Sequence, residues 1–290
     1  MGNFGGHALP GSIFVLISFW HIISLYKRYY RCKRENSKFV SAVWFPCSCL
    51  CGKAESWPIE PVMRVILIII ALALEIYTGS KNGVLYMTGN IQHVTMYFFF
   101  GLASFIDILV YFQANLPTHL DYAMIFLANG VEFILFRFHL HGRSSLDVLL
   151  HTLLLYILVA LAVIIVLEMR YRNNLLIAMT CRFVILLQGT WFWQVGSVLY
   201  KPMFGKWDQE DHEQIMLIPT YFGVHIGVNL LIILLLGSVI SCWSNRKQKQ
   251  CLNDMYTMKR LINTTIHAQT VVDLNDESGE EDGDEFQKAY

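Results

Sequence analysis

Seven long apolar stretches constrain the fold of this chain more than any other feature. A helix needs about 20 consecutive, mostly apolar residues to cross the hydrocarbon core of a bilayer. Stretches of this kind lie at 10–26, 61–79, 92–114, 120–139, 146–169, 174–199 and 214–243. Of the 290 residues, 55% are hydrophobic and only 15% are charged, whereas soluble domains are about a quarter charged. We therefore expect an all-α protein, a seven-transmembrane-helix bundle.

Lysine and arginine are unevenly distributed among the short loops, and cytoplasmic loops carry the excess. One side has Lys27, Arg28, Arg31, Lys33, Arg34, Lys38, Lys53, Arg170, Arg172, Arg246, Lys247 and Lys249. The other side has only Lys81, Arg143, Lys201 and Lys206. We therefore predict an N-terminus that is lumenal or extracellular and a C-terminus in the cytosol. Below, "outer" means the lumenal or extracellular side.

Composition changes sharply after the seventh stretch. Residues 246–290 begin with basic residues, end in an acidic run and contain few apolar ones. Such a segment cannot bury enough apolar surface to offset the entropy of ordering. We predict a membrane domain at 1–245 and a cytosolic, largely disordered tail at 246–290, whose partner the sequence does not identify. We find no nucleic-acid-binding motif.

The seven cysteines are odd in number, and most lie on the predicted cytosolic side, so no disulfide framework is expected. Cys47, Cys49 and Cys51 lie beside the membrane and are either S-palmitoylated or inert.

Two further features concern helix contacts. Gly189 and Gly196 are seven residues apart on one helix face, which predicts close approach of another helix. Arg182 is expected to extend to the membrane interface, and Glu168 to lie at that interface.

Ionisable side chains inside or beside membrane helices are costly to keep and are therefore functional candidates. The densest set lies at the adjoining ends of the fourth and fifth stretches: Glu132, His139, His141, Asp147 and His151. Glu132 and His139 are two helical turns apart, and Asp147 and His151 are one turn apart. The predicted topology adds His93 and His225 on the same outer side, with His7, Glu75, Gln188 and Gln194 around them. We expect these groups to form one outward-opening polar cup.

Imidazole and carboxylate groups together suit Zn²⁺ or another divalent metal. The candidate ligands are His93, Glu132, His139, His141, Asp147, His151 and His225. His139 and His141 diverge by about 200° on a helix, so both reach one ion only if the helix has ended there. The same groups suit proton relay, or simply hydrogen bonds that specify helix packing. We assign no catalytic residue and no organic cofactor.

Several sequence blocks resemble the vertebrate transmembrane protein 45 family, and most closely its A-type branch. They are MGNFGGHALPG at 1–11, QHVTMYFFF at 92–100, the stretch from Glu132 through His139-Leu-His141 and Asp147 to His151, LQGTWFWQ at 187–194, and Trp207-Asp208. The resemblance implies a multipass protein of Golgi, other secretory or endolysosomal membranes with no established activity. It also implies that nine residues stand at the family's polar positions: His7, Glu75, His93, Glu132, His139, His141, Asp147, His151 and His225.

The chain departs from that family at the predicted outer mouth of the cup. The loop at 78–91 is short and lacks a Gly-Pro-His-Leu stretch, and Val224-His225-Ile226 replaces the expected Trp-His-Tyr.

Three functions stay open. We favour a non-enzymatic membrane protein whose polar cup is structural or binds a divalent metal. A metal-dependent lipid hydrolase would use His139, His141, His151 and Asp147, with Ser144 or Ser145 nearby. A proton or metal transporter is the third. The lipid bilayer is the expected partner, and homo-oligomerisation stays open.

Overall fold

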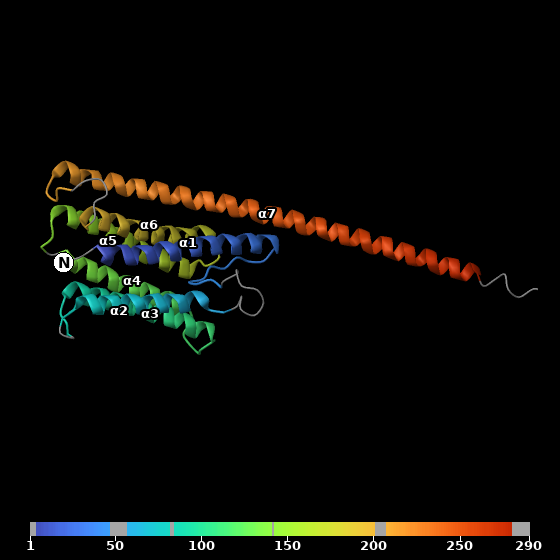
Figure 1. Cartoon of the computed structure of the whole chain (residues 1–290), viewed down its shortest axis with the longest axis horizontal. Helices are drawn as coiled ribbons and strands as arrows, with labels where there is room; N and C mark the ends of the chain where they lie inside the picture. Colours follow the sequence, from blue (N-terminus) through green and yellow to red (C-terminus); the bar gives the residue numbers. More distant parts are fainter. Residues whose placement is uncertain (1–3, 47–56, 82–83, 141, 201–206, 280–290) are drawn as a thin grey trace, which may run out of the picture. The chain divides into compact units, whose positions relative to one another are not determined.

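The computed structural model describes residues 4–46, 57–81, 84–140, 142–200 and 207–279, with no side-chain detail after residue 246 (Figure 1). Its helices are α1 (Phe4–Arg34), α2 (Ile59–Gly79), α3 (Thr88–Tyr111), α4 (Leu120–His139), α5 (Ser145–Arg170), α6 (Leu175–Tyr200) and α7 (His212–Gly279). Each contains all or nearly all of one of the seven apolar stretches, so the all-α prediction is confirmed. Cys47, Cys49, Cys51 and His141 lie outside the described residues.

Five helices within the described ranges are long and apolar enough to cross a membrane: α1, α3, α5, α6 and the His212–Arg246 part of α7. The remaining two are α2, whose apolar stretch includes Arg64 and Glu75, and α4, whose apolar stretch includes Asp121, Glu132 and Arg137. The outward face of α2 is nevertheless apolar, with Ile69 59% and Ile70 50% exposed, while its Glu75 is buried. This distribution suits a helix that contacts lipid outside and polar groups inside. The count of seven spans stays a prediction.

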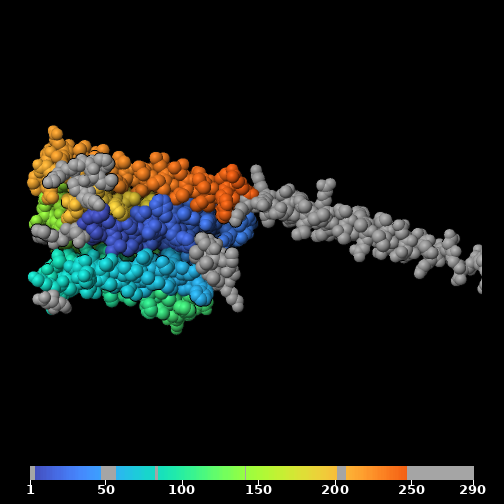
Figure 2. Space-filling view, in the orientation of Figure 1, coloured from blue at the N-terminus to red at the C-terminus, as the bar shows by residue number. Residues whose placement is uncertain are grey.

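Helix packing follows an order that the sequence does not reveal. The closely packed pairs are α1 with α6, α6 with α5, α5 with α4, α4 with α3, and α3 with α2. In the described residues, α1 and α2, at the two ends of this series, are not among the closely packed pairs. Figure 2 shows α1 on the visible face, between α2 and the first part of α7. Both cavities described below are lined by α1 on one side and by α2 and α3 on the other.

Glycines allow α1 to approach α6 closely. A Cβ atom at Gly189 would lie 2.8 Å from the backbone nitrogen of Val15, and one at Gly11 would lie 3.0 Å from the carbonyl oxygen of Gly189. Further along α6, a Cβ at Gly196 would lie 3.1 Å from that of His7. The predicted close approach at Gly189 and Gly196 is therefore confirmed, and its partner is α1.

A short hairpin joins α2 to α3. Strand β1 (Ser80–Lys81) pairs antiparallel with β2 (Val84–Leu85), with Ser80 opposite Leu85. A Cβ at Gly79 would lie only 2.5 Å from that of Asn90, so the end of α2 is tightly packed on the start of α3. The sequence predicted only a polar loop here.

Contacts divide the chain into two compact units, Met1–Ser238 and Val239–Tyr290. The first contains α1 to α6 and the beginning of α7. In the second, α7 continues to Gly279, through residues that composition predicted to be disordered. Disorder of 246–290, and a domain boundary at 245, therefore stay predictions.

Candidate functional site

A cavity of about 560 Å³ lies at one end of the bundle, where several helices begin or end, and we call it the end chamber. Its wall is formed by the first turns of α1 and α3 and the last turns of α2 and α4. The polar lining includes His7, Glu75, Asn90, Gln92, His93, His139 and Arg143. Leu9, Leu74, Met96 and Phe136 supply apolar lining. Four residues of the predicted polar cup, His7, Glu75, His93 and His139, therefore line one cavity.

Glu75 and His93 form the α2–α3 side of the end chamber. His93 Nδ1 lies 3.0 Å from Glu75 Oε1, and Asn90 Nδ2 donates a hydrogen bond of 2.7 Å to Glu75 Oε2. Both carboxylate oxygens of this buried residue therefore have a partner.

On the α4 side, His139 Nδ1 lies 2.8 Å from Gln92 Oε1, and its Nε2 contacts the Arg143 guanidinium. Arg143 also donates to Asp147 Oδ2 at 2.8 Å and to the Tyr200 hydroxyl at 3.4 Å. Burial lowers the pKa of Arg143, but these hydrogen bonds outweigh burial and raise it above its usual value. Arg143 thus carries a fixed positive charge in the loop between α4 and α5.

His151 lies behind the chamber wall and is fully buried. Its Nδ1 hydrogen-bonds the backbone oxygen of Asp147 at 3.0 Å and lies 2.7 Å from Asp147 Oδ1. Its Nε2 lies 3.4 Å from Nε2 of His7, which comes from the first turn of α1. Two imidazoles from α1 and α5, which are not among the closely packed helix pairs of the described chain, therefore face each other through the same ring atom.

The three imidazoles of α3, α4 and α5 share one orientation. In His93, His139 and His151, Nδ1 faces an oxygen atom, from Glu75, Gln92 and Asp147 respectively. An oxygen acceptor at Nδ1 holds the ring proton on that nitrogen, so Nε2 keeps a free lone pair that can bind a metal ion. Histidines that bind metals are usually oriented in this way.

Other predicted site residues lie elsewhere. Glu132 is buried below the chamber, where Gln188 Nε2 donates to its Oε1 at 2.9 Å. His225, on α7, lies 3.4 Å from Gln194 Oε1 and packs edge-on against Trp191. Within the described residues, no group of three or more His, Cys, Asp or Glu side chains is arranged to hold a metal ion. The six predicted ligands that the structure describes, all but His141, therefore do not form one cluster.

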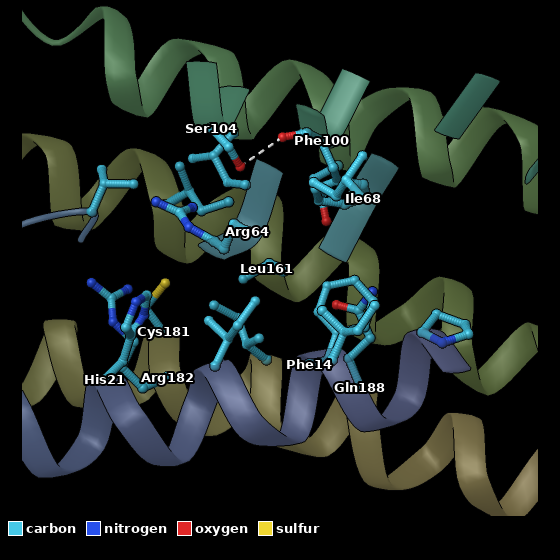
Figure 3. Close-up of a pocket in the computed structure, with 18 of the residues that line it drawn as sticks. Phe14, His21, Arg64, Ile68, Phe100, Ser104, Leu161, Cys181, Arg182 and Gln188 are labelled. Atoms are coloured by element: carbon cyan, nitrogen blue, oxygen red, sulfur yellow. Dashed lines mark hydrogen bonds between the residues drawn. The ribbon is translucent and has the colours of Figure 1, made fainter. Parts of the chain in front are cut away.

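A second, narrower cavity of about 110 Å³ lies inside the bundle, and we call it the central cavity. All six helices from α1 to α6 contribute to its lining, which is mostly apolar. In Figure 3, Phe14 of α1 and Gln188 of α6 face Ile68 of α2 and Phe100 of α3 across this space. Pro10 and Met96 line both cavities, so the two adjoin.

Buried ion pairs lie at the end of the central cavity that is farther from the end chamber. Figure 3 shows His21 beside Cys181 and Arg182 there. Glu60 is bonded by His21 Nε2 at 2.6 Å, by the Trp20 indole and by the backbone N–H of Phe45. Arg64 Nη2 donates to Asp107 Oδ2 at 2.6 Å. The sequence analysis did not find this Glu60 cluster, because nothing in the spacing relates His21 to a residue 39 positions later.

The predictions for Arg182 and Glu168 were wrong. The Arg182 guanidinium donates twice to the Glu168 carboxylate, both at 2.9 Å, and once to the Ala42 carbonyl at 2.7 Å. Arg182 is 4% and Glu168 1% exposed, so neither extends to an interface. The paired N–H···O bonds to one carboxylate give this buried contact a strong, specific geometry.

Comparison with known proteins gives a consistent, coarse result. Residues 118–237 match the sequence model of a family of unknown function (DUF716). Transmembrane epididymal protein 1A of Mus musculus is 24% identical over 263 residues, 84% of this chain and 82% of that protein. The human transmembrane epididymal protein 1 is 25% identical over 156 residues, 52% of this chain and 56% of its own. Transmembrane epididymal protein 1 of Rattus norvegicus is 24% identical over 160 residues, which are 52% of this chain and 50% of that protein.

The apolar helices and these similarities agree. The chain is an integral membrane protein similar to the DUF716 family. Its biochemical activity is unknown, and the narrower resemblance to the transmembrane protein 45 family stays a prediction. The DUF716 match includes His139, Asp147 and His151 but neither His7 nor His93, so the end chamber combines residues from inside and outside the matched region.

Proposed function

We propose that this membrane protein binds a divalent metal ion, Zn²⁺ or a similar ion, between the Nε2 atoms of His7 and His151. The separation of these atoms, 3.4 Å, carries the proposal. In tetrahedral sites with Zn–N bonds of 2.0–2.1 Å, two nitrogen ligands lie about 3.3–3.4 Å apart. An ion could therefore enter with little movement of either ring.

The residues around the pair support this proposal. Asp147 orients His151 through Nδ1, and Arg143 in turn binds the second oxygen of Asp147. A carboxylate or carbonyl behind a ligating imidazole fixes its tautomer and strengthens its basicity. With two protein ligands, the remaining coordination positions would be open to water or to a small molecule in the end chamber.

The hydrolase alternative receives less support from the hydrogen bonds. Ser145 Oγ donates to Glu210 Oε2 at 2.8 Å, while Ser144 Oγ accepts the backbone N–H of Asp147 as the cap of α5. In the described part of the chain, neither hydroxyl is hydrogen-bonded to an imidazole that could activate it. Metal or proton transport stays a prediction from the sequence, without an observation that favours it over binding.

Metal binding can be tested on the purified full-length chain. The protein is stripped with EDTA, loaded with Zn²⁺, desalted and analysed for bound zinc, and its affinity is measured by isothermal titration calorimetry. We expect about one zinc per chain, at least tenfold weaker binding in His151→Ala and His7→Ala, and unchanged binding in His225→Ala, whose imidazole lies outside the end chamber. Wild-type protein that retains no more zinc than His151→Ala would overturn the proposal.

A further inference from the structure

The central cavity is elongated and apolar. Its lining on α1 runs from Pro10 to His21, about 16 Å along a helix that rises 1.5 Å per residue. Ile68, Phe100, Leu161 and similar side chains form the rest of its wall. The shape suits a slender, chain-like apolar molecule rather than a compact one.

Three buried oxygen atoms beside this cavity lack hydrogen-bond partners among the described residues: Asn129 Oδ1, Glu132 Oε2 and Gln188 Oε1. Asn129 and Gln188 line the cavity, and Glu132 adjoins it through its hydrogen bond with Gln188. All three side chains are at most 2% exposed. Asn129 and Glu132 are three residues apart on α4, and Gln188 contacts Glu132. Buried polar atoms are nearly always hydrogen-bonded, so these three acceptors require an explanation.

Glu132 differs from the other buried carboxylates. Glu60, Asp107, Glu168, Asp147 and Glu75 each lie within ion-pair distance of an arginine or a histidine. Within the described chain Glu132 forms no such pair, and it accepts a hydrogen bond from the neutral amide of Gln188. This buried carboxylate has one neutral donor and no positive charge within ion-pair distance among the described residues.

We propose that the central cavity binds a slender apolar molecule with a primary amine at one end. The ammonium group would be held by Glu132, Asn129 and Gln188, and the apolar chain would fill the cavity. An ammonium group has three donors and no acceptor, which matches three unpartnered oxygens, and its charge complements Glu132. A hydroxyl group has one donor and would leave two of these oxygens unsatisfied. The site is separate from the proposed metal pair and does not depend on it.

The test uses the full-length chain in lipid nanodiscs and two probes of equal length, dodecylamine and 1-dodecanol. Binding of radiolabelled probe is measured at equilibrium after subtracting empty nanodiscs. We expect saturable binding of one dodecylamine per chain, at least tenfold tighter than 1-dodecanol. Glu132→Gln, which keeps the side-chain shape, should weaken dodecylamine binding at least tenfold. Gln194→Leu, a matched change on α6 away from both cavities, should bind as wild type does.

Equal affinities for the amine and the alcohol would overturn the proposal, as would wild-type affinity in Glu132→Gln or uptake no greater than in empty nanodiscs. Gln188→Leu should also lose affinity, and its circular dichroism spectrum shows whether it is folded. If Gln188→Leu is not folded, the result for Glu132→Gln alone tests the proposal. Zinc-free protein should bind dodecylamine as loaded protein does, so failure of the metal proposal leaves this result interpretable.

Discussion

Removal of the Arg182 side chain should destabilise the bundle strongly. The substitution Arg182→Met keeps most of the length and apolar volume but removes the guanidinium. It eliminates two hydrogen bonds of 2.9 Å to Glu168 and one of 2.7 Å to the Ala42 carbonyl. The Glu168 carboxylate, 1% exposed, would keep a hydrogen bond from the buried Cys181 thiol and the 3.4 Å contact from the Tyr122 hydroxyl, but no positive partner among the described residues.

The expected cost follows from the unpaired charge that remains. Removing one partner of a buried ion pair costs about 3–5 kcal/mol, because the other charge stays desolvated without compensation. Replacing both partners with apolar residues of similar volume is often nearly neutral. We therefore expect Arg182→Met to lower the free energy of unfolding by about 3–5 kcal/mol, and the double variant Arg182→Met/Glu168→Leu to recover most of that loss.

The assay is equilibrium unfolding of the purified protein, from mixed micelles into increasing mole fractions of SDS, followed by circular dichroism. Arg137→Met, at an exposed arginine of α4, serves as the control and should change stability by less than about 0.5 kcal/mol. If Arg182→Met were no more destabilising than this control, Arg182 would reach an interface as the sequence suggested, and the buried pair would be refuted. A double variant less stable than the single one would refute the explanation by unpaired charge.

Two further predictions concern helix packing and orientation. Gly189→Leu should cost about 1–3 kcal/mol or more in the same unfolding assay, because even a Cβ there would lie 2.8 Å from the Val15 backbone nitrogen. Gly130→Ala, where an added Cβ meets nothing within 4 Å, should be neutral or slightly stabilising, and equal effects at the two glycines would contradict the packing of α1 on α6. For orientation, a membrane-impermeant maleimide should label Asn173→Cys in sealed microsomes of a cysteine-free variant, and Tyr86→Cys only after permeabilisation. The reverse pattern would place the end chamber on the cytosolic side.

The positions of the helices could be predicted because they depend on local composition. The stretch predicted at 120–139 is the extent of α4, since this mostly apolar segment lies between polar segments at both ends. The gathering of His93, His139 and Glu75 at one end followed from alternating helix directions. Neither inference needs knowledge of which helices are neighbours.

The predictions that were wrong concern contacts that depend on tertiary packing. The pairing of Arg182 with Glu168 requires α5 and α6 to bring those two positions face to face, and a lone arginine near a helix end equally suits an interface. His225 was placed in the cup by its depth alone, but it contacts Gln194 and Trp191 instead. His7 was assigned to the periphery because it precedes the first apolar stretch. Only the close approach of α1 to α6 brings it to His151.

The central claim is that imidazoles from α1 and α5 meet at a metal site beside the end chamber. Crystals of the zinc-loaded full-length protein, measured on both sides of the zinc absorption edge, test it most directly. We expect one anomalous peak about 2.0–2.1 Å from Nε2 of both His7 and His151. A peak bound by other residues, or a structure in which these two rings point away from each other, would contradict the account.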